Sequence, residues 1–126
     1  MSNSEVVVMR SAQRFGSTFS ADQINTEWRG ARLFLEVSAV SGTLPALDVK
    51  VQFRDPATGI YHDLPGATFA QKTGISTDEL SIYPGNTAMA NRAVSGPMPF
   101  TWRVAAAISG TNTPSFTFSV GASLQI

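Results

Sequence analysis

The chain has 126 residues, of which 43% are hydrophobic and only 14% are charged, and its formal net charge is zero. This length is typical of one domain that buries a core without covalent staples. The absence of cysteine excludes disulfides, thiolate catalysis and cysteine-based zinc sites, and the zero net charge argues against a nucleic-acid partner.

The low charge has two interpretations, which the composition leaves open. An ordinary β domain favours threonine and avoids lysine and glutamate. A subunit that packs against other subunits also needs little charge, because nothing has to keep copies apart. Most of the basic residues are arginine, which suits interfaces better than lysine.

Residues 1–31 lack a sustained period of either 2 or 3.6, so we interpret them as an irregular N-terminal arm or edge segment. Val6 to Met9 favours a short strand, and a second is expected near residues 23–26. Phe15 and Phe19 are isolated large apolar residues. An arm of this kind wraps its own domain or orders on a neighbouring subunit, and both alternatives stay open.

The apolar run in this arm is short and follows Glu5 instead of a basic segment. It therefore matches neither a secretory signal nor a membrane span. We expect synthesis in the cytoplasm and no membrane association.

Two later segments resemble each other. Residues 33–53 read LFLEVSAV-SGTLP-ALDVKVQF, and residues 101–126 read TWRVAAAI-SGTNTP-SFTFSVGASLQI. In each, an apolar run is followed by Ser-Gly-Thr and then by a proline, Pro45 or Pro114. After the proline, apolar and polar residues alternate strictly. This pattern predicts two similar β-hairpins whose apolar stripes supply most of the core.

Shorter strands are expected at residues 60–64 and 78–83, between these repeats. Residues 84–99 are rich in proline and glycine and predict one long loop, which is either a crossover between sheets or a contact surface. Together, residues 32–126 predict an all-β domain, an antiparallel β-sandwich of about seven or eight strands.

The residues do not suggest catalysis. His62 is the only histidine, and its neighbour Asp63 points to the opposite face of a strand. Asp55 and Asp63 make a loose calcium pattern, and Trp28 or Tyr61 would serve as a platform for stacking a sugar. We predict no enzyme activity, no cofactor and no metal site.

Several motifs resemble small virion structural proteins of tailed bacteriophages and prophages. In that group a strand enters SGT-x-P-x-LDVKVQ, a turn leads to DLPGA-x-FAQ, an aromatic-Arg-Val strand follows, and the chain closes on SGT-x-PSFTFSVG. The corresponding segments are Ser41 to Gln52, Asp55 to Gln71, Trp102 to Val104 and Ser109 to Gly121, and the likeness covers roughly residues 33–126.

The resemblance implies a capsid decoration or cement protein that bridges and stabilises capsid subunits on the virion surface. Its partners would be the phage major capsid protein and further copies of itself, with a trimer as one arrangement. The alternative is a tail- or neck-associated module, or a surface module that binds host glycans. The arm and the long loop supply the predicted partner contacts: Val6, Val8, Phe15, Phe19, Trp28, Met89, Arg92 and Met98.

Overall fold

The computed structural model describes residues 2–126, which form strands, turns and loops without a helix. Along the chain the strands are β1 (Ser4–Arg14), β2 (Thr18–Phe19), β3 (Gln23–Ile24), β4 (Gly30–Arg54), β5 (Tyr61–Thr68), β6 (Ser76–Tyr83), β7 (Ala93–Ser95) and β8 (Thr101–Gln125). The predicted all-β fold is confirmed. None of the described residues forms a helix long and apolar enough to cross a membrane.

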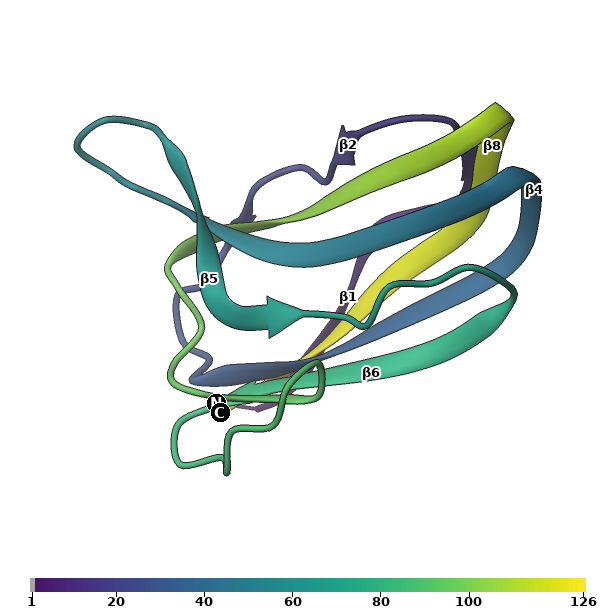
Figure 1. Cartoon of the computed structure of the whole chain (residues 1–126). Helices are drawn as coiled ribbons and strands as arrows, with labels where there is room; N and C mark the ends of the chain where they lie inside the picture. Colours follow the sequence, from purple (N-terminus) through teal and green to yellow (C-terminus); the bar gives the residue numbers. More distant parts are fainter. Residues whose placement is uncertain (1) are drawn as a thin grey trace.

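The two repeats form β4 and β8, strands of 25 residues each. The prediction that each repeat is a hairpin paired with itself is wrong. Instead β4 pairs antiparallel with β8 along its length, from Gly30 opposite Gln125 to Phe53 opposite Trp102. Both strands fold back at the same end of the molecule, as Figure 1 shows.

The Ser-Gly-Thr segments are therefore corners and not hairpin turns. Gly42 and Gly110 have φ angles of 104° and 134°, which a residue with a Cβ rarely adopts. The register between the strands shifts twice between Ser41 and Ala46. Bulges and bends of this kind let one strand pass from one sheet layer to the next.

Each corner strand contributes one half to each of two facing layers (Figure 1). Layer 1 contains β1, the second half of β8, the first half of β4, β6 and β7. Layer 2 contains β2, β3, the first half of β8, the second half of β4 and β5. The arrangement is an antiparallel sandwich with one exception, because β6 and β7 are parallel.

The core lies between the layers and follows the alternation of the two repeats. Its largest fully buried side chains include Trp102, Phe116, Phe118, Leu33, Leu35, Leu47, Leu80 and Ile82. The predicted stripe of β4 breaks at one point, because a register shift after Val37 turns Ala39 outward and lets Val40 pack inward. The stripe of β8 stays buried as far as Leu124, so the C-terminal end is held in the sheet.

The N-terminal segment is more regular than its sequence indicates. β1 pairs with β8 from Ser4 to Arg14, with register shifts on either side of Met9. These bulges hide the period of 2 from a reading of the sequence. β3 accounts for the strand expected near residues 23–26. Of the two alternatives for the arm, these residues adopt the first, since they pair with their own chain.

Two of the predicted partner contacts are corrected by their burial. Val8 is 8% exposed and Met98 is 5% exposed, and both belong to the core. The alternation of β1 turns Val8 to the same inner face as Val6, and the bulge adds Met9 to that face. The long loop packs back on the sandwich, where the amide of Met98 donates to the carbonyl of Arg29. Neither side chain is free to contact a partner.

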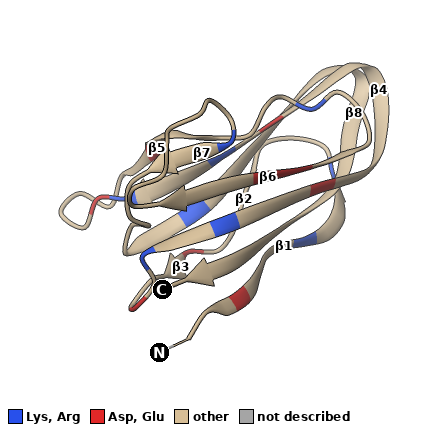
Figure 2. Ribbon diagram, turned by 90° about the horizontal axis from the view of Figure 1, so that it is seen from below, with Lys and Arg blue, Asp and Glu red and all other residues tan. Residues whose placement is uncertain are grey.

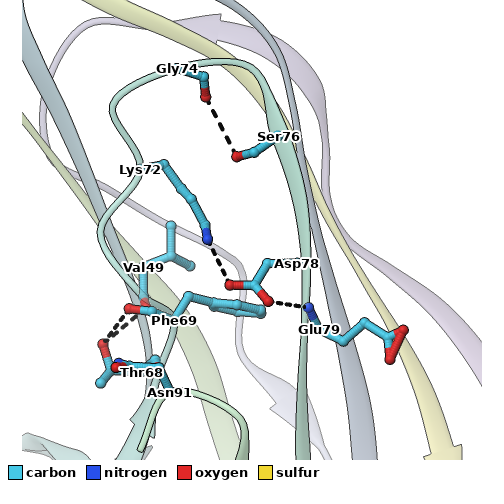
Figure 3. A network of polar contacts seen from close by, with 9 residues as sticks. All are labelled: Val49, Thr68, Phe69, Lys72, Gly74, Ser76, Asp78, Glu79 and Asn91. Carbon is cyan, nitrogen blue, oxygen red and sulfur yellow. Dashed lines mark hydrogen bonds and ion pairs between the residues drawn. The ribbon is translucent and has the colours of Figure 1, made fainter.

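An ion pair fastens the connection between β5 and β6. Lys72 Nζ donates to Asp78 Oδ2 at 2.6 Å, and the backbone amide of Glu79 donates to Asp78 Oδ1 at 2.8 Å (Figure 3). The side chains of Lys72 and Asp78 are only 12% and 10% exposed. Burial acts to raise the pKa of Asp78, but the hydrogen bonds from Lys72 and the Glu79 amide outweigh it and leave the pKa lowered.

We predict that Lys72→Met destabilises the fold at pH 7 by about 3 kcal/mol, because it leaves a buried carboxylate without its cation. Lys72→Met combined with Asp78→Leu should cost less than the single change. Because the folded pKa of Asp78 is lowered, the ion pair stabilises the fold above the carboxyl's ordinary pKa and is lost as the pH falls. Urea unfolding at pH 7 and at acid pH measures both effects. An equal loss at both pH values would contradict the assignment.

Candidate binding face

The outer surface of layer 2 carries an arginine held between two aromatic rings. The guanidinium carbon of Arg103 lies 3.9 Å from the ring centroid of Phe19 and 3.5 Å from that of Tyr61. Arg103 is on β8, between the buried Trp102 and Val104, so the alternation of the strand directs its side chain outward. We call this surface the Arg103 face.

Hydrogen bonds extend the Arg103 face across β4 and β5. Arg103 Nε donates to Gln52 Oε1 at 3.0 Å, and Gln52 Nε2 donates to Asp63 Oδ1 at 2.9 Å. Lys50 Nζ lies 2.9 Å from Asp63 Oδ2. The hydrogen bond from Gln52, followed by that from Lys50, lowers the pKa of Asp63, so this carboxyl stays ionised at neutral pH.

Tyr61 joins the Arg103 face to the N-terminal segment. Its hydroxyl donates to the Asp22 carboxylate, with distances of 2.7 and 2.8 Å to the two oxygens. This bond is the main cause of the raised pKa of Tyr61. Phe19 and Asp22 both come from the stretch that contains β2 and β3. This stretch is therefore fixed to the sheet by a cation–π contact with Arg103 and by a hydrogen bond from Tyr61.

A hollow of about 300 Å³ adjoins the arginine stack. Across the sheet, Phe19 lies opposite Ala105, and Ala105 lies opposite Lys50. The small alanine leaves room between the phenylalanine ring and the lysine. Asp48, Gln52, Ser17, Thr68 and Ala107 complete the walls. The hollow thus combines one aromatic ring with carboxylate, amide and ammonium groups.

The arrangement is suited to binding. Arginine and tyrosine are enriched among the residues that dominate protein interfaces. The network consists largely of exposed ion pairs and hydrogen bonds, which add little to stability. Its side chains are already held in place, which reduces the entropy lost when a partner binds.

The residues considered for chemistry do not come together. His62 is exposed and stacks beside Phe53, with ring centroids 5.7 Å apart. Asp55 caps its own turn by accepting from the Ala57 amide and the Thr58 hydroxyl. Among residues 2–126 no group of three or more His, Asp or Glu side chains gathers as metal ligands. The loose calcium pattern of Asp55 and Asp63 therefore finds no third ligand of these types.

The remaining contact candidates are scattered over the surface. Phe15 and Met89 are 56% and 59% exposed, Arg92 is exposed, and none of them joins the Arg103 face. Trp28 is half-buried against the core, and its indole nitrogen donates to the carbonyl of Ser2 at 3.1 Å. Val6 also packs against the core. Of the eight predicted contacts, only Phe19 lies in the candidate site.

The sequence reading missed Arg103, Gln52 and Asp22. The alternation of residues 102–108 could have placed Arg103 on the outer face. Its aromatic neighbours could not have been found in this way, because Phe19 and Tyr61 come from distant segments. Comparisons with protein-family models, with curated proteins and with solved structures find no match to this chain.

We predict that Tyr61→Phe loosens the β2–β3 stretch without unfolding the protein. The change keeps the ring over Arg103 and removes the hydrogen bond to Asp22. Hydrogen exchange of residues 17–25 should become several-fold faster, which includes the Ser20 amide that donates to Val104. Tyr83→Phe is the matched control, because its hydroxyl bonds to Ile126 elsewhere. Equal exchange in both variants would contradict the role of Asp22.

Proposed function

We propose that this protein is a virion structural protein of a tailed phage, a decoration or cement protein that docks on the capsid and bridges neighbouring capsid subunits. The observation that carries the proposal is the Arg103 face, an exposed surface with the composition of an interface hot spot and with side chains already in place. The resemblance of the sequence motifs to small virion proteins of tailed phages is what suggests the partner.

The fold supports a docking role in a second way. Two corner strands run through both layers, so force applied to one outer face reaches the other through continuous backbone. A sandwich whose two layers share strands in this way would transmit strain between the subunits that it joins. A bridging protein needs this property, because it reinforces a shell only when it resists being deformed with it.

In docking, the guanidinium, the aromatic rings and the hollow of the Arg103 face would each make a different kind of contact. The planar guanidinium offers directed hydrogen bonds to a carboxylate or a carbonyl of the major capsid protein. Phe19 and Tyr61 would supply apolar contact around it. The hollow beside Phe19 would accept a protruding side chain.

We predict that Arg103→Ala weakens binding to capsids by about thirtyfold or more, because a central interface arginine contributes about 2 kcal/mol or more. The measurement is the occupancy of variant protein added to capsids that lack it, read from the band ratio to the major capsid protein on a gel. Arg32→Ala is the matched control, since Arg32 lies on the outer face of layer 1 in an exposed pair with Glu79. Unchanged occupancy for Arg103→Ala would contradict the docking surface.

A second candidate function is glycan binding by a surface or tail module. The hollow beside Phe19 favours it, because an aromatic ring with Asp48, Lys50 and Gln52 suits the apolar face and the hydroxyls of a sugar. Trp28 is a weaker platform than the sequence suggests, since its indole is half-buried and bonded to Ser2.

A glycan array separates the two candidates. We expect no glycan signal from the wild type if the protein is a capsid component, together with a copy number in purified particles close to that of the major capsid protein. A glycan signal that Phe19→Ala abolishes, with few copies in each particle, would favour the tail or surface module.

A further inference from the structure

The outer edge of β1 is open. β1 ends the strand order of layer 1, so only one of its edges pairs, with β8. Among residues 2–126, the backbone hydrogen bonds outside the regular ladders involve none of residues 4–9. This stretch reads SEVVVM and contains no lysine or proline, the residues that usually protect an edge from pairing.

The C-terminal part of β1 pairs irregularly with β8, and Arg14 fills the irregular stretch. Its guanidinium donates to the carbonyl of Ala12 at 3.1 Å, to that of Arg10 at 2.7 Å and to that of Phe118 on β8 at 2.8 Å. It also lies over the ring of Phe118, 4.6 Å from the centroid. Because the pairing of β1 with β8 is irregular beyond Met9, the regular part of the open edge ends at Arg10.

A bulge determines which side chains of β1 point outward. Val8 and Met9 are both buried, with a register shift between Val7 and Met9. The bulge therefore turns Arg10 to the outer face, where Glu5 and Val7 already point. When the two bulged residues are counted as one position, Val7 lies midway between Glu5 and Arg10.

We propose that two copies of this chain join by antiparallel pairing of their β1 edges. Such a pair has a twofold axis, and an axis through Val7 places Val7 of each copy against Val7 of the other. Glu5 then lies opposite Arg10 of the second copy, and Arg10 opposite Glu5. Figure 2 shows an acidic position near the N-terminal end of β1 and a basic one further along.

The charges favour a second copy as the occupant of this edge. Neither Glu5 nor Arg10 forms an ion pair within the described part of the chain. The edge is complementary to itself, because reversing its direction exchanges the acidic and the basic position. In the register with Val7 on the twofold axis, both Glu5–Arg10 pairs between the two copies form together. A shifted register loses these pairs, because it places Glu5 beside a valine.

The pairing also explains an exposed apolar side chain. Val7 is 64% exposed and borders a shallow hollow of about 320 Å³ whose other walls include Phe34 and Gly121. In the paired form Val7 of the second copy covers this valine. The two copies then share a continuous layer in which β1 is no longer an edge. The dimer does not rest on the capsid role, since the chain alone specifies it.

Sedimentation of the purified protein over a range of concentrations tests the proposal. We expect a reversible dimer in the wild type, and Glu5→Arg or Arg10→Glu alone should weaken it about tenfold or more, because each turns two attractions into two repulsions. The two changes together should restore the dimer to within about threefold of the wild type. Glu36→Arg, on the same outer face but on β4, should leave the dimer unchanged.

Val7→Lys provides an independent variant, since it places like charges on the twofold axis and should give a monomer with unchanged unfolding. Slow hydrogen exchange of residues 5–9 in the wild type, and fast exchange in Val7→Lys, would locate the contact. The proposal is overturned if the wild type is monomeric at every concentration, or if the double reversal fails to restore a dimer that the single reversals weaken. A dimer that is insensitive to all of these changes would also overturn it.

Discussion

The pairing of β4 with β8 is the constraint on which the rest of this structure depends. Both strands cross from one layer to the other at neighbouring corners, so the ladder between them runs through the whole sandwich. Every other strand except β7 attaches to one of these two. The largest buried aromatic side chains, Trp102, Phe116 and Phe118, all belong to β8. A change that shifted this register by one residue would turn the core stripe of a whole layer to solvent.

The same strand, β8, contributes the central residue of each outer face. β8 places Arg103 on the outside of layer 2, between rings supplied by β2 and β5. Beyond the corner it places Gly121 on the outside of layer 1, opposite Val7 on one side and Phe34 on the other. The face of layer 2 is thus polar and networked, and the face of layer 1 has a shallow hollow lined by Val7, Phe34 and Gly121.

Much of the fold could be predicted from alternation alone. The stripes of residues 33–37, 47–51 and 116–124 are buried as expected, because a period of 2 determines which face of a strand meets the core. The corners could not be predicted, because a glycine with positive φ serves a tight turn and a layer crossing equally well. Pairing between the repeats, instead of within each repeat, depends on contacts between distant residues that local sequence does not encode.

The candidate site, too, has features that local sequence predicts and features that depend on distant contacts. The exposure of Phe19 follows from its isolated position in a polar segment, whereas Val8 and Met98 were misjudged because the pairing of β1 with β8 and a folded loop bury them. Arg103 gains its importance only from neighbours brought in by β2 and β5. The interaction between Tyr61 and Asp22 joins segments whose separation in sequence gives no hint of contact.

The position of β8 in the chain also has a consequence for biosynthesis. β4 emerges from the ribosome before Thr101–Gln125 has been translated, and until then only β5 and β6 can pair with it, which leaves its edge toward β8 open. Contacts between residues so far apart in the sequence form slowly, so apolar side chains of the nascent chain are exposed to water for a time. Cells that make many copies of this protein at once would depend on chaperones during that interval, and cooler growth should raise the soluble yield.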